Sequence, residues 1–327
     1  MQGSSKTSIR SGVKYRNKQG YFAIKDGIKI NSKPIIKQGD RKPHWLKTAL
    51  PRGPVFQELR DRVKRLELNT VCHESKCPNI GECWNNKTAT LMVLGNVCTR
   101  ACKFCSVDTG NPQGWLDPFE PENIATTVKY MELEYVVITS VDRDDLEDGG
   151  SSHIAKCVEV TKERCPKVAI EVLSPDFLGN NSHLGTLLQS GLDVFAQNIE
   201  TVKRLTKEVR DPRAGYQQTL NLLSHASKEG VVTKSGFMVG FGETNDEIYQ
   251  TLIDLYNHGV EIVTIGQYLR PTKYHIPVHN YISPEQFKDY EQFGKEIGIK
   301  ELVSGSLIRS SYRAEQSFQR INRGNNV

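Results

Sequence analysis

From residue 90 onward, short apolar runs alternate with longer stretches of helical periodicity. The apolar runs cover residues 91–94, 135–139, 168–173, 194–198, 233–239 and 262–269. Within them, neighbours such as Val136 and Val137 are both apolar, which is typical of parallel strands covered on both faces. Each interval between successive runs leaves room for one strand and one covering helix. The pattern therefore predicts a parallel α/β fold.

The periodic stretches between these runs predict helices. They cover residues 123–133, 153–164, 182–189, 217–228 and 246–258. Six strand–helix units favour a partial parallel (β/α)6 barrel of the TIM type, and a doubly wound open sheet is the competing architecture. The dinucleotide-binding form of that open sheet is disfavoured, because no Gly-x-Gly-x-x-Gly motif follows the first strand.

Changes in composition divide the chain into four segments. Residues 1–42 are polar, basic and weakly periodic, and we expect a flexible N-terminal segment. Residues 43–90 form an N-terminal extension that contains a helix predicted at 56–68. Residues 91–282 form the partial barrel, and residues 283–327 form a C-terminal helix and a terminal segment.

The composition is ordinary for a globular protein, with 37% apolar and 25% charged residues. No stretch approaches the ~18 apolar residues of a membrane span, and no apolar signal sequence begins the chain. We therefore expect a cytoplasmic protein without membrane association. A mitochondrial or plastid location is the alternative, because the first 25 residues contain six Lys or Arg and no acid.

The net charge of +5 conceals an uneven distribution. Residues 1–65 contain 17 basic and 4 acidic residues, and the remaining 262 contain 26 and 34. A basic arm is compatible with a zinc-stabilised protein that binds nucleic acid. However, the cysteines lack the paired spacing of zinc fingers, and aromatic residues are not interleaved with the basic ones. We therefore expect no nucleic-acid partner.

Three cysteines follow the first predicted strand directly. Cys98, Cys102 and Cys105 have the spacing C-x3-C-x2-C, at the end of a strand where barrel enzymes place their active sites. Zinc sites usually combine four ligands in paired hooks. Three thiolates in one short loop instead suit three corners of an iron–sulfur cubane, which leaves the fourth iron without a protein ligand.

A second set of three cysteines lies immediately upstream. Cys72, Cys77 and Cys83 have the spacing C-x4-C-x5-C, again without an obvious fourth ligand. Two such sets favour two [4Fe–4S] clusters over one larger site. The last two cysteines of the chain, Cys157 and Cys165, lie far from both sets in the sequence, and we expect them to bind no metal.

The aromatic residue Phe104 completes the form C-x3-C-x-aromatic-C, which resembles the motif of the radical S-adenosylmethionine (SAM) superfamily. This resemblance implies that the open iron of the cluster on Cys98, Cys102 and Cys105 binds the amine and carboxylate of SAM. It also implies that Phe104 contacts the adenine.

The chain further resembles the lipoyl synthases between about residues 42 and 314. The similar segments are residues 71–79, 81–84, 137–146, 234–240 and 309–312. The last of these reads Arg-Ser-Ser-Tyr, and in the family its second serine, here Ser311, binds the fourth iron of the auxiliary cluster. The resemblance thus implies that the C-terminal segment closes over that cluster.

The resemblance implies radical insertion of two sulfur atoms at C6 and C8 of a protein-bound octanoyl chain. These carbons offer no acidic proton, so that a cofactor radical is needed. The auxiliary cluster would donate the sulfur. The implied partners are octanoylated lipoyl domains of 2-oxoacid dehydrogenases, the glycine-cleavage carrier protein, and ferredoxin or flavodoxin as electron donor. We expect a monomer, and a basic N-terminal segment that steers an acidic carrier. A biotin-synthase-like or methylthiolating enzyme is the competing interpretation.

Polar residues at the carboxyl ends of the predicted strands are candidates for contacts to SAM. We expect Asn198 and Glu200 to hold its ribose or amine, and Glu171 and Arg143 to make further cofactor contacts. A polar side chain in a parallel strand needs a hydrogen-bond partner in any case. A purely structural role therefore remains open for each of the four.

Overall fold

The computed structural model describes residues 9–27, 42–46, 53–65, 69–70, 79–85 and 90–324. Its main sheet has eight strands in the order β12-β11-β10-β9-β8-β7-β4-β3. All neighbouring pairs are parallel except β3 with β4. The strands are β3 (Asn69–Thr70), β4 (Thr90–Val93), β7 (Tyr135–Ser140), β8 (Ala169–Leu173), β9 (Val194–Ala196), β10 (Val232–Val239), β11 (Ile262–Gln267) and β12 (Glu301–Gly305).

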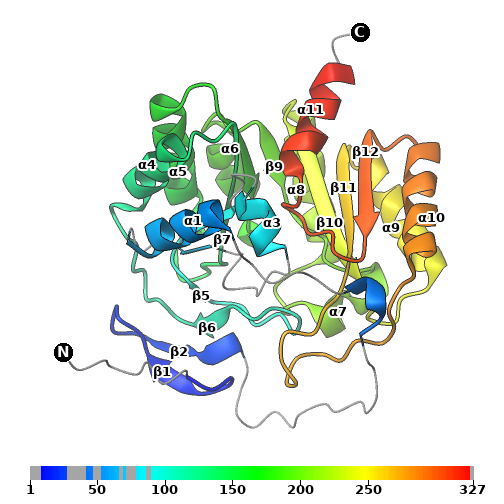
Figure 1. Cartoon of the computed structure of the whole chain (residues 1–327), viewed down its shortest axis with the longest axis horizontal. Helices are drawn as coiled ribbons and strands as arrows, with labels where there is room; N and C mark the ends of the chain where they lie inside the picture. Colours follow the sequence, from blue (N-terminus) through cyan, green and yellow to red (C-terminus); the bar gives the residue numbers. More distant parts are fainter. Residues whose placement is uncertain are drawn as a thin grey trace.

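Helices that alternate with these strands along the chain cover one side of the sheet (Figure 1). They are α4 (Glu120–Tyr130), α5 (Ser151–Arg164), α6 (Asn181–Leu188), α8 (Tyr216–Lys228), α9 (Asn245–Asn257) and α10 (Pro284–Glu296), whereas the short helix α7 (Thr206–Val209) lies in the connection between β9 and α8. Two further helices, α1 (Pro54–Arg65) and α3 (Ile80–Asn85), precede the first parallel strand and lie near one another. Short 3-10 turns occur at Lys25–Gly27, His44–Leu46, Phe177–Gly179 and Lys203–Leu205.

The parallel strands are buried on both faces, as the runs of consecutive apolar residues predict. In β7, Val136, Val137 and Ile138 are each 0% exposed. Burying one such side chain contributes about 1.5–3 kcal/mol, so this sheet is the main source of stability. Helix boundaries follow local capping chemistry, for example at α9, where Thr244 and Glu247 form a reciprocal capping box.

The prediction of a parallel α/β partial barrel is confirmed, with two strands more in the main sheet than the sequence pattern indicated, the antiparallel β3 and the parallel β12. Strand β12 pairs in parallel with β11, opposite Ile262 through Gly266. It reads Glu-Leu-Val-Ser-Gly, and only Leu302 is fully buried, so it lacks the apolar run of the other strands. Strands β9 and β11 also end two residues earlier than expected, where the chain bends into loops at the sheet edge.

Part of the N-terminal segment is ordered, contrary to the expectation of a flexible segment over residues 1–42. Residues 9–27 form a hairpin of β1 (Lys14–Arg16) and β2 (Phe22–Ile24). Strand β2 pairs with β6 (Asp108–Gly110), and β6 pairs with β5 (Val97–Cys98). Basic residues of this segment, such as Lys14 and Arg16, therefore belong to a small four-stranded sheet. Its two remaining strands, β5 and β6, flank the loop with Cys98, Cys102 and Cys105. Residues 1–8 and 28–41 lie outside the described residues.

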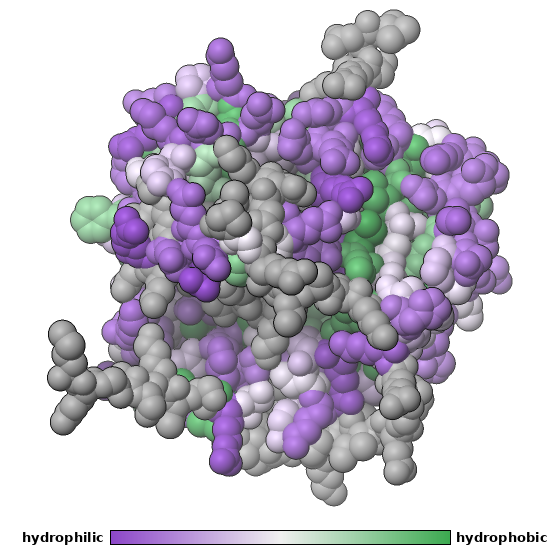
Figure 2. Space-filling view, viewed as in Figure 1, coloured by the Kyte–Doolittle hydropathy of each residue, from purple (hydrophilic) through white to green (hydrophobic). Residues whose placement is uncertain are grey.

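The last helix, α11 (Ala314–Gly324), lies against the inner side of the main sheet. Phe318 packs on the ring of Tyr135 with centroids 5.7 Å apart, and Ala314 packs with Tyr135 and Val137. This face of the molecule is largely hydrophilic, apart from a narrow apolar strip beside α11 (Figure 2). Within the part of the chain that the structure describes, no helix has the length and apolar character of a membrane span.

Candidate active site

A cavity of about 550 Å³ lies at the carboxyl ends of the parallel strands. Its walls come from strand β10, from the loops that follow β4, β7, β8, β9 and β11, and from residues 308–311 of the C-terminal segment. A parallel barrel directs its catalytic groups to this end. The cavity is therefore the candidate active site.

Cys98, Cys102 and Cys105 all line this cavity as free thiols, together with Phe104. The loop between β5 and β6 thus brings together the three cysteines that the sequence pattern grouped. Burial raises the pKa of the Cys102 thiol to about 12 and that of the Cys105 thiol to about 11, and for Cys102 it outweighs the opposing effect of the positive charge of Arg210. A bound metal reverses this effect by deprotonating coordinating thiols. Three converging thiols therefore fit an iron–sulfur cluster.

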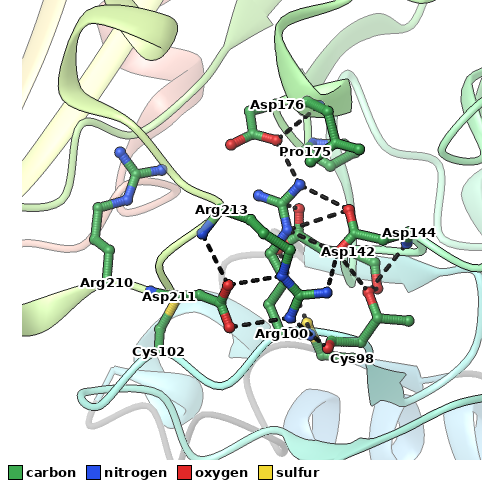
Figure 3. Close-up of polar contacts among 12 residues, drawn as sticks. Cys98, Arg100, Cys102, Asp142, Asp144, Pro175, Asp176, Arg210, Asp211 and Arg213 are labelled. Atoms are coloured by element: carbon green, nitrogen blue, oxygen red, sulfur yellow. Dashed lines mark hydrogen bonds and ion pairs between the residues drawn. The ribbon is translucent and has the colours of Figure 1, made fainter. Parts of the chain in front are cut away.

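Ion pairs surround the loop that carries these thiols (Figure 3). Asp142 Oδ2 lies 3.8 Å from Cys98 Sγ, and its Oδ1 lies 3.4 Å from the guanidinium of Arg100. Burial raises the pKa of Asp142 to about 6, although the charge of Arg100 opposes this shift. The backbone N–H of Asp211 donates to Cys102 Sγ at 3.3 Å. The thiols are thus tied to two barrel loops besides their own.

Asn198 and Glu200 line the cavity, as expected from their place after β9. Their side chains are hydrogen-bonded to one another, and burial raises the pKa of Glu200. Glu200 has a φ of 68°, which is uncommon for a residue other than glycine. Its backbone is held in this conformation by hydrogen bonds with Gly236 and Met238, each of 3.0 Å. The strand end is therefore a preorganised polar corner of the cavity.

Four buried polar atoms in the cavity wall have no hydrogen-bond partner within the described part of the chain. They are Ser140 Oγ, Asp176 Oδ2, Gln197 Oε1 and Arg210 Nε, and they account for most of the seven such atoms among the described residues. Buried polar atoms are normally paired. Single unpartnered atoms on one anionic, one cationic and two neutral side chains suit a zwitterionic ligand that carries hydroxyls, as SAM does.

Arg210 is the functional candidate that the sequence reasoning missed. It is 7% exposed, and its Nη1 donates to Thr219 Oγ1 at 3.0 Å. Its position in the run Val209-Arg210-Asp211, which follows the fourth barrel strand, is the signal that could have singled it out. A buried guanidinium with a donor to spare is a candidate partner for a carboxylate.

The second cysteine set is only partly described. Cys83 lies on α3, whereas Cys72, Cys77 and the neighbouring His73 lie outside the described residues. Ser311 lines the cavity. The residues next to Cys83 and Ser311 are hydrogen-bonded, because the Tyr312 hydroxyl donates to Glu82 Oε1 at 2.8 Å. Asn79 Nδ2 also donates to the Leu307 carbonyl at 2.6 Å. The start of α3 and the C-terminal segment are therefore joined across 228 residues.

Two expected cofactor contacts lie elsewhere. Glu171 is 0% exposed and does not line the cavity, because both of its oxygens are bound by Lys234 Nζ at 2.8 and 2.9 Å. Arg143 is also outside the cavity wall, and it donates to Asp145 and to the carbonyls of Leu94 and Trp115. Buried charges need such partners. In this structure neither residue lines the cavity, and both are bound by other residues of the protein.

The two remaining cysteines are separate from the site. Cys157 is buried in the main core, and Cys165 packs at its margin, and neither lines the cavity. Gln267, at the end of β11, is likewise occupied by the carbonyls of Val239, Tyr268 and Asn280. The barrel therefore directs three of its six described cysteines to one place.

Two solved structures illustrate the likeness of this fold to known ones. A Streptococcus suis SuiB structure with bound S-adenosylmethionine superimposes with a TM-score of 0.53 and 11% identity, over 70% of this chain and 54% of that one. Methylornithine synthase (PylB) gives a TM-score of 0.50 and 14% identity, over 83% of this chain and 92% of that one. At such identities the likeness concerns the fold.

Sequence comparison is more specific. The family model of the Radical SAM superfamily matches residues 92–255, and that of the N-terminal domain of lipoyl synthase matches residues 18–77. Lipoyl synthase from Marinobacter nauticus is 55% identical over 330 residues, covering 100% of this chain and 95% of the relative. Lipoyl synthase from Legionella pneumophila (strain Paris) is 53% identical over 321 residues, covering 98% and 97%. The chain belongs to the lipoyl synthase family of the radical SAM superfamily.

Proposed function

We propose that Cys98, Cys102 and Cys105 bind a [4Fe–4S] cluster and that the cavity beside them binds SAM. The family inserts sulfur at C6 and C8 of a protein-bound octanoyl chain, and its superfamily uses one such cluster with SAM. The observation that carries the residue assignment is the convergence of three free thiols with four unpaired polar atoms in one cavity. When bound, the clusters and SAM supply the radical and the sulfur for this chemistry.

The unpaired atoms suggest which residues of the cavity wall contact each group of SAM. Arg210 Nε pairs with the methionine carboxylate of SAM, because a guanidinium donor to a carboxylate gives a strong, charge-assisted hydrogen bond. Asp176 Oδ2 and Ser140 Oγ accept from its ammonium group. Asn198 and Glu200 hold the ribose hydroxyls, and Phe104 contacts the adenine. These groups orient SAM and exclude water from the cavity while the reaction proceeds.

We further propose that Cys72, Cys77, Cys83 and Ser311 bind the auxiliary cluster. The support is the link between α3 and the C-terminal segment, in which Tyr312 and Arg313 both donate to Glu82. This link holds the residue beside Cys83 close to the residue beside Ser311. A serine oxygen would complete a ligand set of three thiolates.

The substrate reaches this site on a carrier protein. We propose that octanoylated lipoyl domains of 2-oxoacid dehydrogenases and the glycine-cleavage carrier protein are used, with ferredoxin or flavodoxin as donor, by a cytoplasmic, monomeric enzyme. The exposed cations Arg10, Lys14 and Arg16 on the β1–β2 hairpin steer an acidic carrier. Their substitution by glutamine raises the KM for a carrier domain and leaves that for an octanoyl-lysine peptide unchanged. A basic segment without this role leaves both values unchanged.

Iron content tests the ligand assignment. Wild type, the triple alanine variant at Cys98, Cys102 and Cys105, and the triple variant at Cys72, Cys77 and Cys83 are purified anaerobically. We expect about eight irons per wild-type chain and about four in each triple variant. Only the variant that retains the barrel cysteines keeps a cluster whose electron paramagnetic resonance (EPR) spectrum shifts when SAM is added.

Cys157→Ser with Cys165→Ser is the matched control, because it also removes thiols but none from either proposed site. This control retains the iron content of the wild type. A barrel triple variant with the full iron content overturns the assignment of the SAM cluster. An upstream triple variant with the full iron content overturns that of the auxiliary cluster.

A further inference from the structure

Between the first two barrel thiols lies Arg100, whose side chain extends into a group of carboxylates that includes Asp176, a proposed SAM contact (Figure 3). The Arg100 side chain is 2% exposed. Its Nε and Nη2 both donate to Asp144, at distances of 2.8 to 3.2 Å, and its Nη2 lies 2.7 Å from Asp176 Oδ1. The forked guanidinium therefore joins the thiol loop to the loops that follow β7 and β8.

The backbone around Arg100 is held by residues of two other barrel loops, Asp142, Asp211 and Arg213. Thr99 N and Thr99 Oγ1 both donate to the Asp142 carbonyl at 2.9 Å, and Ala101 N donates to Asp211 Oδ2 at 2.9 Å. Arg213 Nη2 donates to the Thr99 carbonyl at 2.8 Å. The backbone N–H of Arg100 itself points to Cys98 Sγ at 3.4 Å. A displacement of Arg100 would thus move both Cys98 and Cys102.

We propose that Arg100 is a positioning residue that fixes the thiol loop against the barrel and so sets the geometry of the SAM cluster. Three carboxylates, those of Asp142, Asp144 and Asp176, face its guanidinium from two other loops. Without the guanidinium they repel one another, and Asp142 is left facing Cys98 Sγ, which is anionic when it binds iron. This inference rests on the proposed assignment of Cys98, Cys102 and Cys105.

A charge at this place is not sufficient for the role. A lysine ammonium is a point charge on a flexible stem and cannot reproduce the fork that reaches Asp144 and Asp176 together. Positioning therefore predicts that Arg100→Lys behaves like Arg100→Gln. A role through net charge alone predicts that lysine restores the behaviour of the wild type.

The test compares wild type with Arg100→Gln, Arg100→Lys and the milder variant Asp144→Asn. Arg204→Gln is the control, because Arg204 forms an exposed pair with Glu247 outside the thiol loop. The readouts are the far-UV circular dichroism, the rate of iron release to a chelator, and the fraction of reduced cluster whose EPR spectrum shifts with SAM. Removal of groups that orient metal ligands typically weakens metal binding about 10- to 100-fold.

We expect native circular dichroism and iron release about 10-fold faster or more in both Arg100 variants, with a smaller increase in Asp144→Asn and none in Arg204→Gln. The SAM-responsive EPR fraction falls in the same order. The positioning role is refuted if Arg100→Lys has the iron-release rate and SAM-responsive EPR fraction of the wild type. It is also refuted if the two single variants Asp144→Asn and Arg100→Gln both do. Cys102→Ala separates the two proposals: if it also keeps the wild-type iron, the cluster assignment itself fails.

Discussion

Lys234 and Glu171 form a buried ion pair whose removal has a calculable cost. Lys234 Nζ lies 2.9 and 2.8 Å from the two Glu171 oxygens, and the side chains are 2% and 0% exposed. The Tyr135 hydroxyl donates to Glu171 Oε2 at 2.6 Å. Burial and the Glu171 carboxylate raise the pKa of Tyr135 well above its ordinary value, so this phenol stays protonated.

Lys234→Met retains most of the apolar stem and removes the ammonium. The Glu171 carboxylate then keeps only Tyr135 as a partner inside the protein, and breaking a buried pair in this way costs about 3–5 kcal/mol. For a chain of this size each kcal/mol lowers Tm by about 2 °C, which gives a decrease of about 6–10 °C. The double variant Lys234→Met, Glu171→Leu removes both charges and stays within about 1–2 kcal/mol of the wild type.

Thermal unfolding followed by circular dichroism, at equal iron content, measures these differences. Titration of the double variant with SAM tests whether Glu171 contacts the cofactor, because Glu171 lies outside the cavity wall. We expect the wild-type affinity. A single variant as stable as the wild type would refute the energetic argument. A folded double variant that no longer binds SAM would show that Glu171 is needed in the cofactor site.

Three further predictions concern separate parts of the molecule. Arg210→Gln weakens SAM binding about 10- to 100-fold by calorimetry, since a hydrogen bond to a charged group contributes about 1.5–3 kcal/mol; an unchanged affinity excludes the proposed carboxylate contact. Gly110→Ala makes residues 9–27 more sensitive to protease, because its Cβ would lie 2.4 Å from the Phe22 carbonyl, whereas Gly185→Ala, with open space, does not. Glu247→Gln destabilises the chain by at most about 1 kcal/mol at pH 7, because the ion pair with Arg204 that it removes is exposed. The hydrogen bond from Arg204 lowers the pKa of Glu247 from 4.5 to about 2. The difference in free energy of unfolding between wild type and variant therefore narrows as the pH falls from 4.5 toward 2. Chemical denaturation that gives the same difference at every pH contradicts this prediction.

The parallel strands were predictable because their burial on both faces leaves an unbroken apolar signal, as in β7. Strand β12 was not, because four of its five residues are only partly buried and a neighbouring strand, rather than its own composition, fixes its conformation. The hairpin at residues 9–27 depends in the same way on a distant partner: strand β2 pairs with β6, and Asp26 N donates to Asp108 Oδ1 at 2.8 Å. No local pattern in the N-terminal sequence contains that information.

The candidate site divides along a similar line. The spacing of Cys98, Cys102 and Cys105 within one loop was enough to bring the thiols together. Strand ends also pointed correctly to Asn198 and Glu200 as cavity residues. The same rule failed to distinguish Glu171, because a carboxylate in a barrel strand can face Lys234 as well as a ligand. Only the three-dimensional pairing shows which polar groups are already satisfied and which, like Arg210 Nε, are not.

We propose that this chain itself supplies the sulfur, from a cluster bound by Cys72, Cys77, Cys83 and Ser311. The most direct test is a single anaerobic turnover of an octanoyl-lysine peptide with SAM and a reductant, using protein whose clusters were rebuilt with heavy-isotope sulfide. With light sulfide in solution, we expect two heavy sulfur atoms in the product. We also expect no sulfur insertion by the triple alanine variant at Cys72, Cys77 and Cys83. Light sulfur in that product, or insertion by the triple variant, would contradict it.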